Sequence, residues 1–201
     1  MCARGVQALF AAAFVACASA AFAQAPALEV KGAFELPVWK TIVVGSHRGV
    51  DAVRDALDRE RIVIGDSADE ILGRPAFTFA AERRALNLVL RSVAELGFGE
   101  RGATLADIHS RAVRLGFELC PEEVGPQLRL QYRNQPVGEF LHLAMKPQRT
   151  YDGELTDFTL ANTGAGLTLL GGSAKPDLVL AGNVTFVFVR PSVSVVGSRE
   201  P

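Results

Sequence analysis

The sequence predicts an α+β fold, in which a mixed N-terminal half with two or three helices packs on a mainly antiparallel β-sheet. Three observations support this fold class. Apolar residues recur at helical spacing in the first half of the chain, the period falls to two from Gln127 onwards, and glycine-rich turns separate the later apolar segments. No strand–helix–strand rhythm repeats along the chain, so a parallel sheet covered by helices is not expected.

The first half of the predicted domain mixes short strands with helices. Residues 38–44 are rich in β-branched side chains and end at a glycine, which predicts a strand. The clearest helix is expected at residues 104–115, where Thr104 can cap the first turn and Asp107 lies near the positive end of the helix dipole. Further helices are expected at residues 50–57 and 67–72, and further strands at residues 62–64, 77–79 and 86–93.

The second half is expected to form a meander of strands. Residues 127–133 alternate between apolar and polar side chains, which predicts a strand with one buried face. Residues 134–138 supply a turn and residues 139–145 a second strand, so the two segments are expected to form a hairpin. The sheet is expected to continue through residues 158–160, 167–170, 178–180 and 184–190.

The N-terminus has the pattern of a secretory signal peptide at residues 1–23. A basic residue, Arg4, precedes an apolar run, and Ala21-Phe22-Ala23 forms an A-x-A cleavage site. The remaining chain divides into a flexible leader (24–35), a single α+β domain (36–191) and a C-terminal tail (192–201). The protein is therefore expected to be periplasmic or secreted. An alternative interpretation is a lipid anchor at Cys17, because the residues before it weakly resemble a lipobox.

Charge and composition exclude several classes of partner. The chain carries a formal net charge of −1 and shows no basic stripe, so it is not expected to bind nucleic acid. After the signal, no apolar run is long enough for a transmembrane helix. The three histidines lack metal-ligand spacing, and no phosphate loop or dinucleotide motif is present, so neither a metal nor a cofactor is expected.

The segment from residue 118 to residue 145 carries the candidate binding residues. In the expected hairpin, Arg129, Gln131 and His142 can share one face, and a guanidinium binds carboxylate or phosphate in bidentate fashion. With Gln135 and Glu139 they form a candidate face for a small polar or anionic ligand, or for a protein partner. In the alternative interpretation, these residues are a solvated sheet face on which the arginines pair with neighbouring glutamates.

Catalytic candidates lie in the same segment. Cys120 is the one cysteine outside the signal, and Pro121 can place it at a helix N-terminus, where a thiol is activated. Such a thiol could act with His142 as base and Glu122 as orienting group. A carboxylate pair of Glu122 and Glu139 is the second catalytic possibility. The bland alternative for Cys120 is a buried, inert thiol.

A string of motifs runs through the middle of the chain. It reads ELGF at residues 95–98, GAT at 102–104, LCPEEVGPQLRLQY at 119–132, QP at 135–136 and GE at 138–139. In these motifs the chain resembles an uncharacterised family of bacterial proteins. The resemblance implies no activity, ligand or catalytic residue. The expected function is therefore an exported, non-catalytic binding or interaction module, with a small hydrolase as the alternative.

Overall fold

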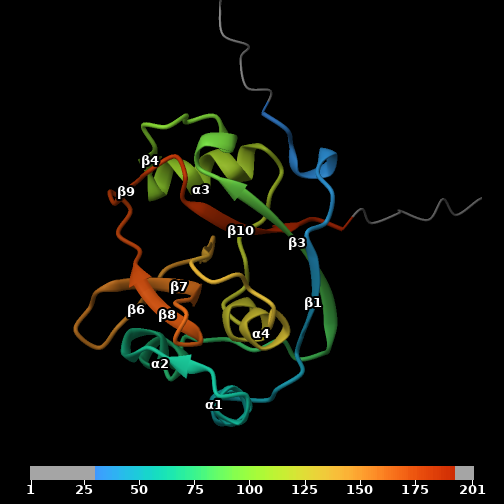
Figure 1. Cartoon of the computed structure of the whole chain (residues 1–201), viewed down its shortest axis with the longest axis vertical. Helices are drawn as coiled ribbons and strands as arrows, with labels where there is room; N and C mark the ends of the chain where they lie inside the picture. The colour runs from blue at the N-terminus through green and yellow to red at the C-terminus, as the bar shows by residue number, and fades with distance from the viewer. Residues whose placement is uncertain (1–29, 193–201) are drawn as a thin grey trace, which may run out of the picture.

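A computed structural model describes residues 30–192 of the chain (Figure 1). The expected signal peptide, Cys17, the start of the leader and all but the first residue of the C-terminal tail lie outside the described residues. Within the described part, no helix is both long enough and apolar enough to span a membrane.

The prediction of an α+β fold is confirmed. The four α-helices of the described residues are α1 (Val50–Arg59), α2 (Asp66–Leu72), α3 (Leu105–Arg114) and α4 (Val124–Gln131). Two short 3-10 turns, η1 (Ala33–Glu35) and η2 (Ala94–Leu96), precede and follow the first strands. The strands are β1 (Lys40–Val44), β2 (Val63–Ile64), β3 (Arg84–Ser92), β4 (Ala103–Thr104), β5 (Phe140–Leu143), β6 (Gln148–Arg149), β7 (Leu155–Asn162), β8 (Leu167–Ser173), β9 (Val179–Leu180) and β10 (Thr185–Arg190).

Most of the strands form one sheet with the order β1-β3-β10-β5-β7-β8-β2, and β6 also pairs with β7. Two of its pairings, β10 with β5 and β2 with β8, are parallel, and the others are antiparallel. The parallel pair of β5 and β10 joins segments that are far apart in the sequence. A separate small sheet pairs β4 with β9.

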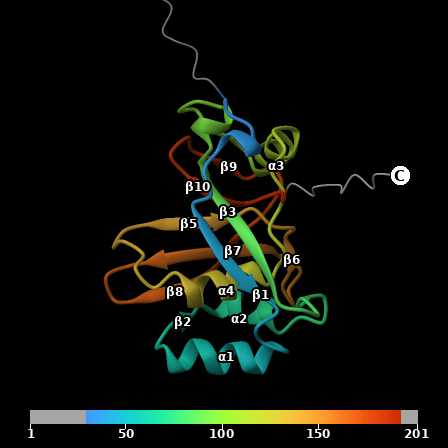
Figure 2. The same ribbon diagram turned by 90° about the vertical axis from the view of Figure 1, so that its right-hand side faces the viewer.

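The sheet curls around α4. Figure 1 shows this helix nearly end-on, with β1 on one side and β7 and β8 on the other, and α4 contacts all three strands. Six consecutive residues of the helix, from Val124 to Arg129, are buried. Gly125 lets the helix approach β7, because a Cβ atom at this position would lie 2.4 Å from Cδ2 of Phe158. Figure 2 shows α1 lying across the base of the molecule, below α4.

Two apolar clusters lie on the two faces of the sheet. Val187 and Val189 of β10 belong to the cluster that also packs against α1, α2 and α4. Phe186 and Phe188, on the opposite face of the same strand, belong to the cluster beneath α3. The period-two pattern of β10 therefore serves two cores rather than a core and a solvated face.

The expected strand at residues 127–133 is wrong, because most of this segment is helix α4. The alternation of apolar and polar residues is also compatible with a helix, since Leu128 and Tyr132 lie one turn apart and are both buried. A helix that is buried on most sides lacks the usual one-sided apolar stripe, and in α4 only the last two residues, Leu130 and Gln131, are not buried. The expected hairpin is consequently absent: β5 pairs with β7 and β10 instead.

Two smaller expectations also differ from the structure. Residues 77–79, expected as a strand, have no regular structure, although Phe77 is buried in the core. Residues 30–35, placed in the flexible leader, include a packed turn: Ala33 is fully buried and its N–H donates to the carbonyl of Leu115 at 2.9 Å. The packed part of the chain therefore begins before residue 36.

Candidate functional site

Arg129, expected on a ligand-binding face, is buried in the interior. Its exposed fraction is 0%, and its guanidinium donates to the side chain of Gln135 and to the carbonyls of Tyr132 and Ala161. Burial lowers its pKa to about 10. Among the described residues it forms no ion pair. The expectation that Arg129 recognises an anion is therefore wrong, because Nη1 and Nη2 donate inside the fold and Nε, which has no partner among the described residues, is buried as well.

Gln135 and Gln131 are structural as well. The Gln135 amide, which accepts from Arg129, donates to the carbonyls of Glu139 at 3.1 Å and Leu160 at 3.3 Å. The Gln131 amide accepts from the N–H of Val43 and donates to its carbonyl, both at 2.9 Å. These contacts hold the end of α4 to β1 and β7, and they leave neither amide on a binding face with His142.

The polar side of α4 continues from Gln131 to two buried residues that the sequence analysis did not single out as site residues. Glu123 is 1% exposed and accepts from the N–H groups of Gly45 at 2.7 Å and Ala80 at 2.8 Å. Gln127 donates to the Glu123 carboxylate at 3.1 Å. The i, i+4 spacing of these residues places them along one side of the helix. Glu123 thus holds the loops at Gly45 and Ala80 against α4, and both side chains are buried.

Cys120 is an inert core thiol. It is 3% exposed, and Sγ lies 3.4 Å from the carbonyl of Val187, to which it donates. Burial raises the pKa of the thiol, which opposes formation of the nucleophilic thiolate. No hydrogen bond joins it to His142 or Glu122 among the described residues. The structure therefore gives no support to the Cys120–His142–Glu122 arrangement.

We expect Cys120 to resist a water-soluble thiol reagent in the native protein and to react once the chain is unfolded in urea. Mass spectrometry of the peptide that carries Cys120 measures this. A Ser173→Cys variant, whose new thiol replaces an exposed side chain, is the control and should react in the native state. Rapid native labelling of Cys120 would restore the thiol mechanism.

The carboxylate pair is not assembled either. Glu122 accepts from Thr78 at 2.9 Å and from Gln148 at 3.1 Å. Glu139 accepts from the Tyr132 hydroxyl at 2.9 Å. Burial and this hydrogen bond together raise the pKa of Tyr132 to about 12. The two carboxylates share no hydrogen-bond partner and line different pockets.

Two of the expected site residues do meet in one solvent-open pocket. Glu139 and His142 line a cavity of about 360 Å³ where β5 and β10 begin, which we call the Glu139–His142 hollow. Its other lining residues are Gly138, Phe140, Asn183, Val184 and Thr185. The parallel pairing of the two strands, which places Thr185 opposite Leu141, brings these segments together.

Polar side chains on β5 and β7 lie next to one another between the hollow and the interior of the sheet. Nδ1 of His142 lies 3.3 Å from the hydroxyl of Thr159 on the adjacent strand β7, and the imidazole packs on Phe186 with ring centroids 5.5 Å apart. Burial lowers the pKa of His142 from its usual range and so favours the neutral ring. Asp157 precedes Thr159 by two residues on β7. It is buried, and its Oδ1 has no hydrogen-bond partner among the described residues.

Burial raises the pKa of Asp157 well above its usual range and so favours the neutral carboxyl. Gly172 on β8 lies beside it: a Cβ there would be 3.3 Å from Oδ1 of Asp157. The sequence analysis missed this residue. The one available signal was a carboxylate inside the run 155–160, whose neighbours are apolar or threonine.

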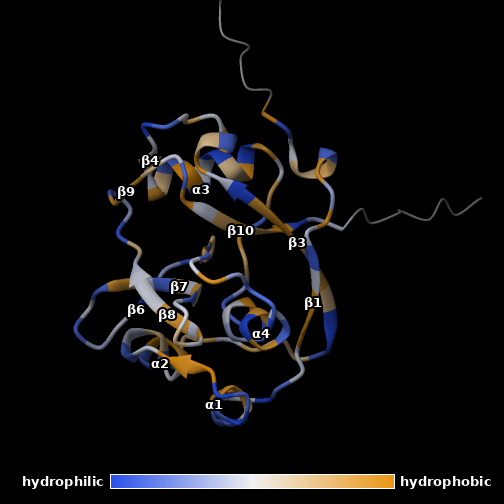
Figure 3. Ribbon diagram, in the orientation of Figure 1, coloured by the Kyte–Doolittle hydropathy of each residue, from blue (hydrophilic) through white to orange (hydrophobic). Residues whose placement is uncertain are grey.

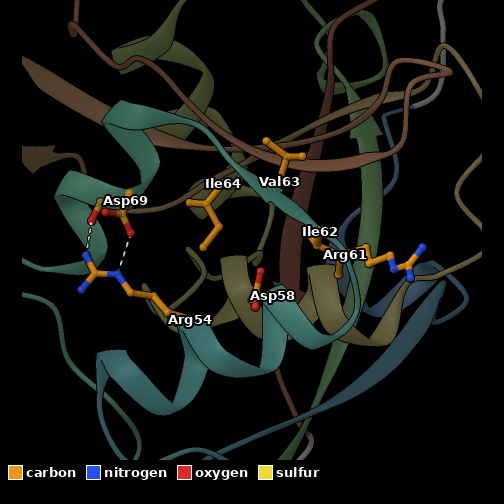
Figure 4. A pocket seen from close by; sticks show the side chains of 7 residues that line it. All are labelled: Arg54, Asp58, Arg61, Ile62, Val63, Ile64 and Asp69. Carbon is orange, nitrogen blue, oxygen red and sulfur yellow. Dashed lines mark hydrogen bonds and ion pairs between the residues drawn. The ribbon is translucent and has the colours of Figure 1, made fainter.

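A larger cleft of about 600 Å³ lies between α1, β2 and α2 (Figure 4). β2 stands out there as an apolar segment at the end of the sheet (Figure 3), and Val63 is 60% exposed. Nε of Arg54 lies 2.6 Å from Oδ1 of Asp69, and its Nη2 donates to the Asp69 carbonyl at 3.1 Å. Figure 4 shows Arg61 extending away from this pair. Arg54 and Asp69 therefore satisfy each other, Arg61 extends away from them, and the side chain of Asp58 projects into the cleft.

Arg61 has a structural explanation for its unusual backbone. It is the one non-glycine residue of the described chain with a positive φ, 54°. The N–H of Arg61 donates to the carbonyl of Asp58 at 2.8 Å, and that of Ile62 to Leu57 at 2.9 Å. This is the Schellman motif that ends α1, with arginine at the position that glycine usually occupies. The strain thus belongs to the helix end and marks no site.

Among the described residues, no cluster of histidine, cysteine, aspartate and glutamate is arranged to hold a metal ion. Comparisons with protein-family models, with curated proteins and with solved structures gave no match for this chain.

Proposed function

We propose that this chain is an exported, non-catalytic binding module that holds a small polar ligand in the Glu139–His142 hollow. The observation that carries the proposal is an open cavity of about 360 Å³ where β5 and β10 begin, which Glu139, His142 and Asn183 line. Export rests on the signal-like residues 1–23. We also propose membership in the bacterial family that the motifs resemble; these motifs include Gly138 and Glu139 of this site, and residues 39–42 and 186–188 fit the same pattern.

A binding role is favoured over hydrolysis by the positions of the candidate nucleophiles and acids. The thiol of Cys120 is enclosed in the core, and the carboxylates of Glu122 and Glu139 line separate pockets. An enzyme needs its reacting groups in one cavity. A binding module needs only a cavity whose polar groups fix the orientation of a ligand, as this hollow offers.

The proposal also changes the expected ligand chemistry. The sequence analysis expected the Arg129 guanidinium to bind an anionic ligand. That group is buried, where it donates to Gln135 and to two carbonyls, and so it is not available to a ligand. The hollow is lined instead by a carboxylate and uncharged polar groups. We therefore propose a ligand without a negative charge.

The test is native mass spectrometry of protein recovered from the exporting cell, compared with Glu139→Gln and His142→Gln variants. We expect the wild-type protein to carry a small molecule that both variants lose. Glu118→Gln, which changes an exposed glutamate in another part of the fold, is the control and should keep the ligand. A ligand that survives both site variants, or one that the wild-type protein converts to product, would overturn the proposal.

A further inference from the structure

The lining of the Glu139–His142 hollow combines an exposed aromatic ring with uncharged hydrogen-bonding groups. Phe140 is 49% exposed, although it is a large apolar residue. It precedes His142 by two residues on β5, so both side chains lie on the same face of the strand. Thr185 is the first residue of the neighbouring strand β10, and Asn183 lies in the turn that precedes this strand. The aromatic ring of Phe140 and the imidazole of His142 thus lie on one face of β5, and Asn183 lines the same cavity.

The charges of the lining exclude an anion as the preferred ligand. No lysine or arginine lines the hollow, and Glu139 contributes a carboxylate. A phosphate or carboxylate ligand would find no positive partner there and would be repelled by Glu139. Burial of His142 lowers its pKa and so opposes a positive charge on the ring, the remaining basic group of the lining.

The hydrogen-bonding groups distinguish a hydroxyl-rich ligand from an amine. An ammonium group only donates, so it would leave the amide N–H groups of Asn183 without a partner. Asn183 and a neutral imidazole each offer both donors and acceptors, and sugar hydroxyls also donate and accept. Since Nδ1 of His142 faces Thr159, Nε2 is the ring nitrogen left for the ligand.

We infer that the hollow binds a neutral saccharide, with one face of a sugar ring on Phe140 and hydroxyls bound by Glu139, Asn183 and His142. This inference rests on the proposed function, because it names the ligand class of the same site. One oxygen of Glu139 is held by the Tyr132 hydroxyl, which orients the carboxylate toward a fixed direction. The cavity of about 360 Å³ lies at the small end of the ~300–1,000 Å³ of ligand sites, so a mono- or disaccharide is expected.

The experiment is a titration of the full-length protein, followed by isothermal calorimetry, with three sets of probes: neutral mono- and disaccharides, primary amines, and inorganic phosphate with simple carboxylates. We expect binding of at least one saccharide, weakened about tenfold or more by Phe140→Ala and by Glu139→Gln. Phe34→Ala removes another exposed phenylalanine, on η1, and is the matched control that should bind as the wild type does.

Salt supplies a second readout. Raising the NaCl concentration to 0.5 M should leave saccharide binding nearly unchanged, whereas an amine held by the Glu139 carboxylate would be weakened. Binding of an amine but of no saccharide, lost in Glu139→Gln, would overturn the saccharide inference and keep the proposed site. Binding of none of the probes by a folded protein, or saccharide binding that is unchanged in both site variants, would overturn the inference and the site together.

Discussion

Arg129→Ala is expected to lower the free energy of unfolding by about 3–5 kcal/mol, the larger of the effects that we predict. The change removes one of the largest fully buried side chains and leaves a cavity beside α4. It also leaves the Gln135 amide oxygen and two carbonyls, those of Tyr132 and Ala161, without their donor. For a domain of this size, the melting temperature should fall by about 10 °C.

Urea unfolding followed by circular dichroism measures this loss, and Arg133→Ala is its control. Arg133 lies only a few residues away but is half exposed and pairs with Glu60 at the surface. A surface ion pair contributes about 0–1 kcal/mol, so the control should remain close to the wild type. Equal losses in the two variants would contradict the internal role that we assign to Arg129.

Glu123→Ala is expected to lower the free energy of unfolding by about 2–4 kcal/mol. The buried carboxylate is the acceptor for the N–H groups of Gly45 and Ala80 and for the Gln127 amide. Without it, the two half-buried N–H groups lose their acceptor, and the Gln127 amide keeps only the Nδ1 atom of His47 as a partner. Glu123→Gln keeps one acceptor oxygen and should cause a smaller loss than Glu123→Ala.

The adjacent residue provides the control for this prediction. Glu122 accepts from Thr78 and Gln148 at a more exposed position, so Glu122→Ala should cost about 1 kcal/mol or less. Chemical unfolding of the three variants at one pH gives the comparison. If Glu122→Ala proved as costly as Glu123→Ala, the fastening of the loops to α4 would not be the source of the stability.

Local sequence signals identified those elements whose structure is decided locally. Thr104 caps α3 as expected, since its hydroxyl accepts from the N–H of Asp107 at 3.2 Å within four residues of chain. Local patterns did not predict helix α4, because segments distant in the sequence decide the environment of this helix. The burial of Arg129 depends on Gln135 and on Ala161 of β7, and no period in residues 127–133 could reveal those partners.

The candidate site shows the same limit. Glu139 and His142 were chosen for a hairpin that does not form, yet they line one cavity because β5 pairs in parallel with β10. That pairing brings in Asn183 and Thr185, about 40 residues away in the chain, and sequence patterns carry no register between such distant strands. Asp157 lay hidden for a similar reason, because its burial is set by neighbouring strands rather than by its own segment.

The amide of Gln131 has a consequence for association between molecules. By binding both the N–H and the carbonyl of Val43, it occupies two of the outward-facing backbone groups of β1, the last strand on its side of the sheet. Open strand edges are common starting points for aggregation. At the opposite end, β2 is only two residues long and offers a foreign strand little backbone to pair with. Edge-to-edge association of the curled sheet is therefore opposed at one end by the side chain of Gln131 and at the other by the short length of β2.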